Sequence, residues 1–203
     1  MSALKELGPS AEAIEKLKFF QALVEKWNPR INLVAKSTLP DLWERHIEDS
    51  ARLCLFAPNN ARRWADLGSG GGFPGLVVAV LLQDGCAKTE VVLVESDLRK
   101  ATFLREAARQ MGIVVDVRSE RAETLDALSA DIVSARALAS LDSLCGLAAR
   151  HLAAGGLCLF PKGEKCAEEV QSARKSWRFD LEASENPGHK GSALLVLRNL
   201  HRA

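Results

Sequence analysis

Apolar residues recur at helical spacing through the first part of the chain. One stripe begins after Ser10, a residue type that caps helices, ends at Asn28-Pro29 and contains Ile14, Leu17, Phe20, Leu23, Val24 and Trp27. A second stripe starts near Pro40 and contains Leu42, Trp43, His46, Ile47, Ser50 and Leu53. The two stripes predict two amphipathic helices, which together form an N-terminal helical cap over residues 1–58.

Beyond residue 62, short apolar runs alternate with helical patterns, as in strands joined by crossover helices. The pattern predicts strands at residues 63–67, 91–95, 114–118, 132–135, 157–160, 179–183 and 193–197. It predicts helices between them at residues 75–82, 100–111, 141–152 and 165–176. Only residues 184–192 join the last two strands, which is too short for a crossover and indicates an antiparallel hairpin. Residues 59–203 are therefore expected to form one compact α/β unit, a Rossmann-like, mostly parallel seven-stranded sheet with a C-terminal antiparallel hairpin.

Composition narrows the class of protein without fixing its partner. The 203 residues are 47% hydrophobic and 26% charged, which is enough apolar content for a globular core. No apolar run of membrane-spanning length and no secretory leader is seen, so a cytoplasmic protein is expected. Five cysteines without a C-x-x-C pair and four scattered histidines predict no metal site. A net charge of +1 leaves the partner open, because phosphate binding depends on local clusters of Lys and Arg.

The most informative segment is residues 64–75, Trp-Ala-Asp-Leu-Gly-Ser-Gly-Gly-Gly-Phe-Pro-Gly, which leaves a strand and enters a helix. Glycines lack Cβ and adopt positive φ, so the backbone at Gly68 and Gly70 can approach a bound nucleoside closely. The carboxylate of Asp66 can accept a hydrogen bond from a ligand ammonium group or order the loop through its N–H groups. Glycine turns also join strands to helices for steric reasons alone, so the surrounding residues decide the interpretation.

Further polar residues follow the neighbouring predicted strands, at the sheet edge where open α/β folds bind ligands. Glu95 ends the second strand, where an acid can accept hydrogen bonds from both hydroxyls of a ribose. Arg121-Ala122-Glu123 follows the third strand, where a turn can receive an adenine edge. Arg136 closes the fourth strand and can contact a cofactor carboxylate or a phosphate. Lys162 follows the fifth strand and can meet a phosphate or a target base.

These residues leave alternatives open. Glu95 beside a glycine turn also fits the NAD of an oxidoreductase, although dinucleotide folds rarely need an acid at the position of Asp66. A non-catalytic RNA-binding module on the same fold is a second alternative. Arg136 and Lys162 are also compatible with ordinary exposed cations near strand ends.

Longer motifs are spread over nearly the whole chain. They are Trp27-Asn28 with Asn32-Leu33, Arg45-His46-Ile47-Glu48-Asp49-Ser50, the 66–75 turn, Arg99-Lys100 with Phe103-Leu104, Arg118 with Arg121-Ala122-Glu123, Ala135-Arg136-Ala137, and Lys162-Gly163. This set resembles the bacterial glucose-inhibited division protein B family, also called ribosomal RNA small-subunit methyltransferase G. Arg-His-Ile-x-Asp-Ser and Gly-Phe-Pro-Gly are specific to that family, whereas the first glycines occur in all class I methyltransferases.

The resemblance implies an activity that the patterns alone do not. A Rossmann-like class I S-adenosylmethionine-dependent methyltransferase would transfer a methyl group to N7 of a guanine in the decoding-region loop of 16S ribosomal RNA. Its substrate would be that RNA or the assembling small ribosomal subunit, and we expect a monomer. Guanine N7 carries a lone pair and no proton, so the transfer needs alignment more than a general base.

The resemblance also implies roles for individual residues. Motif by motif, the cofactor contacts are Gly68, Phe73, Ala122, Glu123 and Arg136, and Asp66, Gly70 and Glu95 join them on the physical grounds given above. The RNA side comprises His46, Asp49, Arg136 and Lys162. Arg136 and Lys162 are the expected catalytic residues, with no metal.

Overall fold

The computed structural model describes residues 2–185 and 191–203, which contain a seven-stranded sheet in the order β3-β2-β1-β4-β5-β7-β6. The strands are β1 (Arg63–Leu67), β2 (Glu90–Val94), β3 (Asp116–Arg118), β4 (Ala130–Ser134), β5 (Leu152–Lys162), β6 (Trp177–Glu185) and β7 (Ala193–Arg202). Strands β1 to β5 pair in parallel, whereas β7 runs antiparallel to β5 and to β6. The predicted fold class and its C-terminal hairpin are therefore confirmed. Part of the predicted 184–192 connection, residues 186–190, lies outside the described residues.

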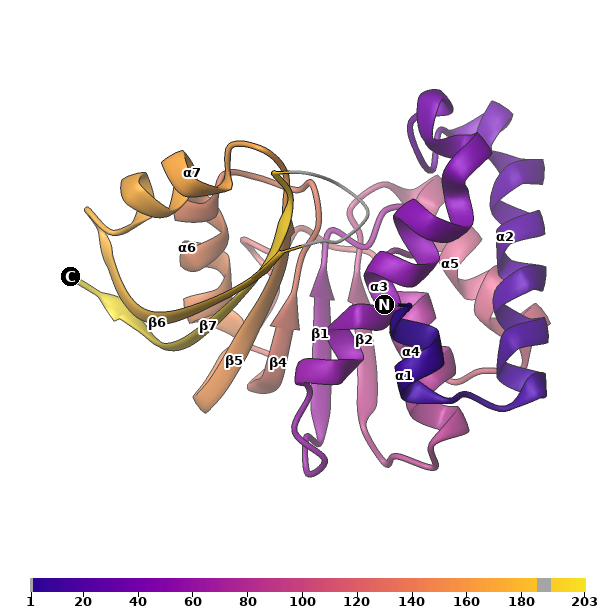
Figure 1. Cartoon of the computed structure of the whole chain (residues 1–203), viewed down its shortest axis with the longest axis horizontal. Helices are drawn as coiled ribbons and strands as arrows, with labels where there is room; N and C mark the ends of the chain where they lie inside the picture. The colour runs from indigo at the N-terminus through magenta and orange to yellow at the C-terminus, as the bar shows by residue number, and fades with distance from the viewer. Residues whose placement is uncertain (1, 186–190) are drawn as a thin grey trace.

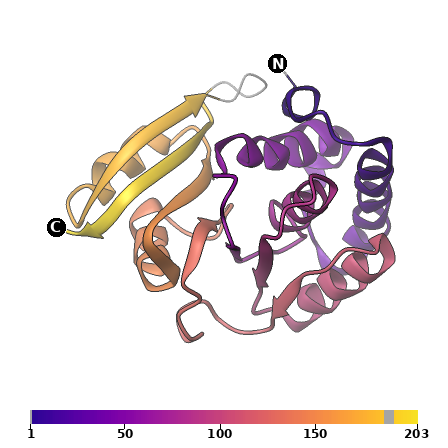
Figure 2. The same cartoon turned by 90° about the horizontal axis from the view of Figure 1, so that it is seen from below.

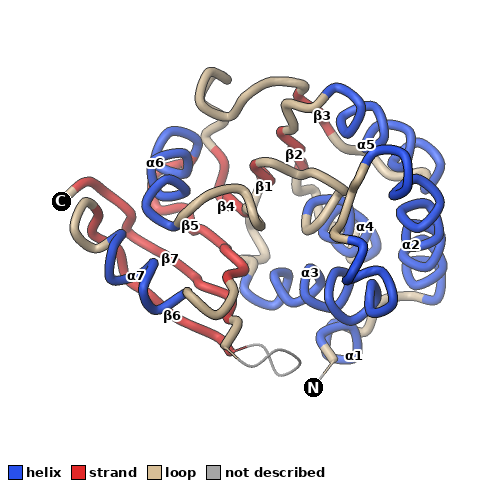
Figure 3. Tube along the Cα trace, turned by 90° about the horizontal axis from the view of Figure 1, so that it is seen from above, coloured by secondary structure: helices blue, strands red, loops and turns tan. Residues whose placement is uncertain are grey.

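Helices cover both faces of the sheet (Figures 1 and 3). The helical elements are α1 (Ala3–Leu7), α2 (Ala11–Ile31), η1 (Lys36–Asp41), η2 (Trp43–Glu48), α3 (Asp49–Ala51), η3 (Arg52–Phe56), α4 (Gly75–Asp84), α5 (Leu98–Met111), α6 (Leu141–His151) and α7 (Cys166–Ala173). Side chains alternate along β2: Val91 and Leu93 pack in the core beneath α2, α4 and α5, and Val92 and Val94 pack in the core beneath α6 and α7.

The N-terminal segment shares its core with the sheet. Leu17 and Phe20 of α2 are fully buried in the same cluster as Leu76 of α4 and Leu93 of β2. The Phe20 ring lies 4.9 Å, centroid to centroid, from the ring of Phe73. Figure 2 shows α2 and the β6-β7 hairpin at opposite ends of the molecule. The predicted helical cap therefore docks on the first half of the sheet, beside the glycine turn.

The prediction that the first long helix ends at Asn28-Pro29 is wrong, because α2 continues to Ile31. Pro29 lies in the last turn and lacks the N–H that would donate to the carbonyl of residue 25, and the helix continues for only two residues beyond it. Asn32 then closes the helix in the left-handed conformation, and its N–H donates to the Asn28 carbonyl. The short helix α1, capped by Ser2 and Gly8, was not predicted.

The second predicted helix is not one regular helix. A 3-10 turn (η1), a π turn (η2), a single α turn (α3) and a second 3-10 turn (η3) replace it. The hydroxyl of Ser50 donates to the carbonyl of His46 inside this stretch, and π turns of this kind are frequent at functional sites. The residues predicted to face the core still do so. Those that are buried are Leu42, His46, Ile47, Ser50 and Leu53, and Trp43 is half-buried.

The ends of several strands also differ from the prediction. β3 begins only at Asp116, because Val114, predicted as its first residue, is 81% exposed and outside the ladder. β5, β6 and β7 are longer than predicted. Their extensions are mostly exposed or half-buried, so no alternation of apolar residues marks them in the sequence.

Candidate active site

The glycine turn follows β1 and has the backbone conformation that the sequence requires. Gly68, Gly70 and Gly72 all have positive φ, at 68°, 54° and 93°. A Cβ at Gly70 would meet no atom closer than 3.7 Å, so the turn is open there. A Cβ at Gly71 would lie 2.7 Å from the carbonyl oxygen of Leu33. One side of the turn therefore faces open space, while the other carries the N-terminal segment.

Asp66 lies beneath this turn, fully buried. Its Oδ2 accepts a hydrogen bond from the Gly75 N–H at 3.2 Å, and its Oδ1 accepts one from the Ser134 hydroxyl at 2.7 Å. Burial raises the pKa of Asp66 to about 6, against the hydrogen bonds of Ser134, Ser69 and Gly75, which lower it. Of the two roles considered for this carboxylate, the geometry matches the ordering of the loop, since Asp66 does not line the cavity described below.

Glu95 follows β2 and orders the turn from the other side. Its Oε2 accepts from the Gly70 N–H at 2.8 Å, and its Oε1 accepts from the Asp97 N–H at 2.7 Å. The residue is only 8% exposed, yet it lines the cavity. Each carboxylate oxygen can accept more than one hydrogen bond, so Glu95 retains capacity for ligand hydroxyls.

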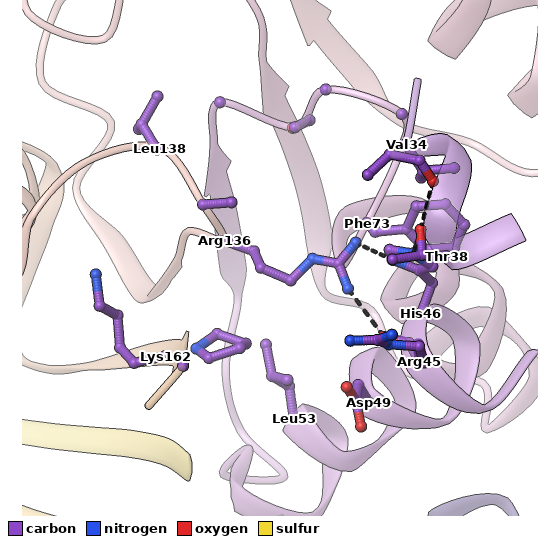
Figure 4. Close-up of a pocket in the computed structure, with 18 of the residues that line it drawn as sticks. Val34, Thr38, Arg45, His46, Asp49, Leu53, Phe73, Arg136, Leu138 and Lys162 are labelled. Atoms are coloured by element: carbon purple, nitrogen blue, oxygen red, sulfur yellow. Dashed lines mark hydrogen bonds between the residues drawn. The ribbon is translucent and has the colours of Figure 1, made fainter. Parts of the chain in front are cut away.

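Arg136 extends from the end of β4 toward the N-terminal segment (Figure 4). Its guanidinium donates to the Arg45 carbonyl at 3.3 Å and to Nδ1 of His46. An arginine can only donate, so Nδ1 of His46 accepts and Nε2 carries the hydrogen, which it shares with Oγ1 of Thr38 at 2.8 Å. The Arg136 guanidinium also lies 5.4 Å from the ring centroid of Phe73.

The charge of Arg136 is retained in this setting. Burial lowers its pKa to about 10, while the nearby carboxylates of Asp49 and Asp66 raise it. At neutral pH the guanidinium is therefore positive, at a half-buried position in the wall of the cavity described below. Charge-assisted hydrogen bonds to an anion are strongest under such conditions.

Lys162, at the end of β5, lies across the cavity from this group (Figure 4). Its Nζ pairs with Oε2 of Glu169 at 2.6 Å and donates to the Ala139 carbonyl at 3.0 Å. Leu138, in the loop after β4, also lines the cavity and is 42% exposed.

The structure does not bring Ala122 and Glu123 into the walls of this cavity. Ala122 is buried, and its carbonyl accepts a hydrogen bond from Nε2 of His151 at 2.7 Å, while Glu123 is exposed. Arg150 donates to the carbonyl of Leu125 at 2.9 Å, so the end of α6 holds this turn at two points. Burial lowers the pKa of His151, which keeps its ring neutral.

Apart from Asp66, which lies beneath the glycine turn, the remaining predicted residues surround one cavity of about 760 Å³ at the carboxyl ends of the parallel strands. This volume accommodates a nucleoside-sized ligand together with part of a second molecule. Sequence-predicted residues in its walls are Gly68, Gly70, Phe73, Glu95, His46, Asp49, Arg136 and Lys162.

The walls also contain residues to which the sequence assigns no role, among them Thr38, Arg45, Leu138 and Glu169. Arg45 stands beside His46 in the same motif, which is a signal that could have identified it. Thr38, Leu138 and Glu169 come from irregular loops or a helix face, and no spacing marks them. Among the described residues, no helix is long and apolar enough to span a membrane, and no three metal-ligating side chains are grouped together.

The fold of the chain is that of S-adenosylmethionine-dependent methyltransferases. An O-methyltransferase of this kind from Thermotoga maritima has a TM-score of 0.54 at 14% identity, covering 76% of this chain and 66% of that one. A tRNA methyltransferase from Aquifex aeolicus has a TM-score of 0.55 at 13% identity, covering 76% and 69%. Identities this low establish the fold class alone.

Comparison of sequences identifies the family. The profile of GidB, described as rRNA small subunit methyltransferase G, matches residues 13–194. The ribosomal RNA small subunit methyltransferase G of Ruegeria pomeroyi is 50% identical over 196 residues, covering 97% of this chain and 96% of the relative. The chain therefore belongs to the rRNA small subunit methyltransferase G family, as its motifs indicated. Membership makes it an S-adenosylmethionine-dependent methyltransferase and does not favour the oxidoreductase or the non-catalytic alternative.

Proposed function

We propose that this chain transfers a methyl group from S-adenosylmethionine to N7 of a guanine in the decoding-region loop of 16S ribosomal RNA. The observation that carries the proposal is the cavity at the carboxyl edge of the sheet. There an open glycine turn and a buried carboxylate face a cationic wall that the family-specific motif around His46 helps to build. The names of the relatives support small-subunit ribosomal RNA as the substrate.

The turn and Glu95 fit the adenosyl part of the methyl donor. A Cβ at Gly70 would extend into open space, so the bare backbone leaves room for a ligand. The carboxylate of Glu95 is fixed by two backbone N–H groups and can still accept hydrogen bonds from ribose hydroxyls. Asp66 supports this site from below by fixing Gly75 and Ser134, rather than by contact with the ligand.

Ala122 and Glu123 remain the proposed adenine contacts. They follow β3, which lies next to β2 in the sheet, so an adenine would extend from Glu95 across β2 toward them. The hydrogen bond from His151 fixes the Ala122 carbonyl and therefore the course of this turn.

Arg136 is proposed to bind an anionic group, either the carboxylate of the methyl donor or a phosphate of the RNA. Methylation at N7 leaves the guanine positively charged, so a cation placed against that atom would oppose the reaction. His46 and the Arg45 carbonyl orient the guanidinium, and Asp49 lies near enough to raise its pKa. The methionine sulfonium supplies an activated methyl group, and the protein supplies alignment and exclusion of water.

The cap and the sheet are proposed to act as one compact unit, divided in sequence near residue 58. A monomer in the cytoplasm is the simplest form in which this cavity could reach a large RNA. His46 and Asp49 of the cap line the cavity, which supports their proposed role as RNA contacts.

The test is transfer of labelled methyl from S-adenosylmethionine to 16S RNA and to isolated small subunits, by the wild type and by Gly68→Asp. A side chain at Gly68 would meet Leu138 at 2.6 Å and strain a φ of 68°. We expect transfer by the wild type and a loss of at least about 100-fold in the variant. Transfer to neither substrate by the wild type, or undiminished transfer by a folded variant, would overturn the proposal.

A further inference from the structure

Residues 137–140, the part of the β4–α6 connection that follows Arg136, lie between the glycine turn and Lys162. Ala137 has a φ of 53°, a left-handed conformation that costs a residue with a Cβ about 1 kcal/mol. Leu138 next to it is a large apolar side chain that is 42% exposed and lines the cavity. Surrounding contacts must hold a loop of this conformation in place.

A single ion pair provides those contacts. Nζ of Lys162 donates to the Ala139 carbonyl at 3.0 Å and pairs with Oε2 of Glu169 at 2.6 Å. The same Oε2 accepts from the N–H of Leu141, the first residue of α6, at 2.7 Å. The pair thus holds the loop at the end that enters α6, through the Ala139 carbonyl and the Leu141 N–H.

The pair is too enclosed and too well matched to act as a phosphate site. The Lys162 side chain is 9% exposed and that of Glu169 is 26% exposed. The carboxylate neutralises the ammonium group, and breaking the pair to bind a phosphate would leave a partly buried carboxylate without its cation. Lys162 is therefore poorly suited to the phosphate contact considered from the sequence.

Leu138 is the side chain that this arrangement positions. It lies against the glycine turn, since a Cβ on Gly68 would come within 2.6 Å of Leu138 Cδ1. Its exposed side faces the cavity between the turn and Lys162 (Figure 4). Enzymes that modify a base commonly hold it against apolar side chains in their pocket.

We propose that Leu138 packs against the face of the target base, and that Lys162 and Glu169 are positioning residues that hold the 137–140 loop for that contact. The inference rests on the proposed function, because it assumes a base in this cavity. It assigns Lys162 to the loop and not to the RNA backbone. The inference thus specifies the substrate as a base that has left its stack, with one face in contact with an aliphatic side chain.

The test compares Lys162→Met, Glu169→Gln and the double variant, with Lys165→Met and Glu168→Gln as matched controls on exposed residues of the same segment. Readouts are kcat and KM for 16S RNA, the Kd of S-adenosylhomocysteine, and the slope of log Kd for RNA against log salt. We expect each single variant to lower kcat about 10- to 100-fold. The kcat of the double variant should be no lower than that of the less active single variant, because both substitutions break the same ion pair. The Kd of S-adenosylhomocysteine, which also reports folding, and the salt slope should match those of the controls.

A phosphate contact predicts a different result. Lys162→Met would then reduce the salt slope by about 0.7 to 0.9, and Glu169→Gln, which frees the cation, would not lower kcat. Either outcome, or an unchanged kcat in both variants, would overturn the positioning role.

Leu138 itself is tested with Leu138→Ala and Leu138→Met. We expect Leu138→Ala to raise KM for RNA and lower kcat, and Leu138→Met, which keeps the volume, to restore both. Wild-type kinetics for Leu138→Ala would contradict the base contact. If the wild type transferred no methyl to RNA, the proposed function itself would fail, so the two failures are distinguishable.

Discussion

Asp66 shows how one residue couples the site to stability. Its carboxyl group is fully buried beneath the glycine turn. Burial disfavours the charged form and raises the pKa to about 6. In the unfolded chain the same group titrates near 4. Between these values the folded state binds more protons than the unfolded state, so the contribution of Asp66 to the free energy of unfolding falls as the pH rises.

The prediction concerns the difference between wild type and Asp66→Asn. The free energy of unfolding of the wild type should fall relative to the variant by on the order of 3 kcal/mol from about pH 4 to about pH 6, and change little above. Urea unfolding at a series of pH values measures this difference, in which the other titrating groups cancel. Parallel curves for the two proteins across that range would show that Asp66 does not titrate as described.

Glu95 is the residue on which the ribose contact depends. Glu95→Gln keeps the shape of the side chain but directs an amide N–H toward one of the two backbone donors that the carboxylate binds. Loss of a charged hydrogen-bond acceptor should weaken the binding of S-adenosylhomocysteine about 10- to 100-fold. Calorimetric titration measures the Kd, and Glu120→Gln, an exposed acid after β3, is the control. Equal affinity of Glu95→Gln and wild type would remove Glu95 from the proposed site.

At the scale of elements, the docking of the cap on the glycine turn is tightest at Gly71. A Cβ there would lie 2.7 Å from the Leu33 carbonyl oxygen and 3.0 Å from the Leu33 Cβ. Backbone of both segments would have to move, so Gly71→Ala should lower the free energy of unfolding by about 1 to 3 kcal/mol. Denaturant unfolding checks this value.

Gly146 provides the matched control for that substitution. It lies in α6, where an added Cβ would meet only the Trp177 ring at an ordinary 3.7 Å. Gly146→Ala should therefore stabilise the protein by about 0.5 to 1 kcal/mol through helix propensity. A Gly71→Ala protein as stable as wild type would mean that Leu33 of the cap does not pack closely against Gly71.

Elements with strong local signals were predictable from the sequence. β1 has the predicted bounds, and the turn after it has positive φ at Gly68, Gly70 and Gly72, as its glycines indicated. The stretch from about Pro40 to Leu53 is predicted as one helix, because its apolar spacing does not reveal that tertiary contacts such as that of Arg136 with His46 accompany a π turn.

The walls of the cavity were predictable where a motif marks them, as for His46, Glu95 and Arg136. The sequence gives no signal for Glu169. Its ion-pair partner, Lys162, and the Leu141 N–H that donates to it belong to other elements, which only the fold brings together. The position of Lys162 after its strand and the Lys162-Gly163 motif predict an RNA contact, and neither reveals the hydrogen bond of Lys162 to the 137–140 loop.

At the scale of the whole molecule, a net charge of +1 gives no long-range attraction for RNA. The cations available to RNA are therefore local: Arg45, Arg52, Lys100 and Arg136 line the cavity, near the carboxylates of Asp49 and Glu95 and beside the Lys162–Glu169 ion pair. Cap, sheet and hairpin all contribute to these walls. The molecule is thus organised around one edge of the sheet, where cofactor and base would meet.

The most direct test of this account locates the transferred methyl group at atomic detail. Purified protein is incubated with 16S RNA or small subunits and S-adenosylmethionine carrying a labelled methyl, and the modified nucleoside is mapped by mass spectrometry of RNA fragments. The account predicts one labelled 7-methylguanine, in the decoding-region loop, and none with Gly68→Asp. Label on another base, on a different atom of guanine, or on no RNA at all would contradict it.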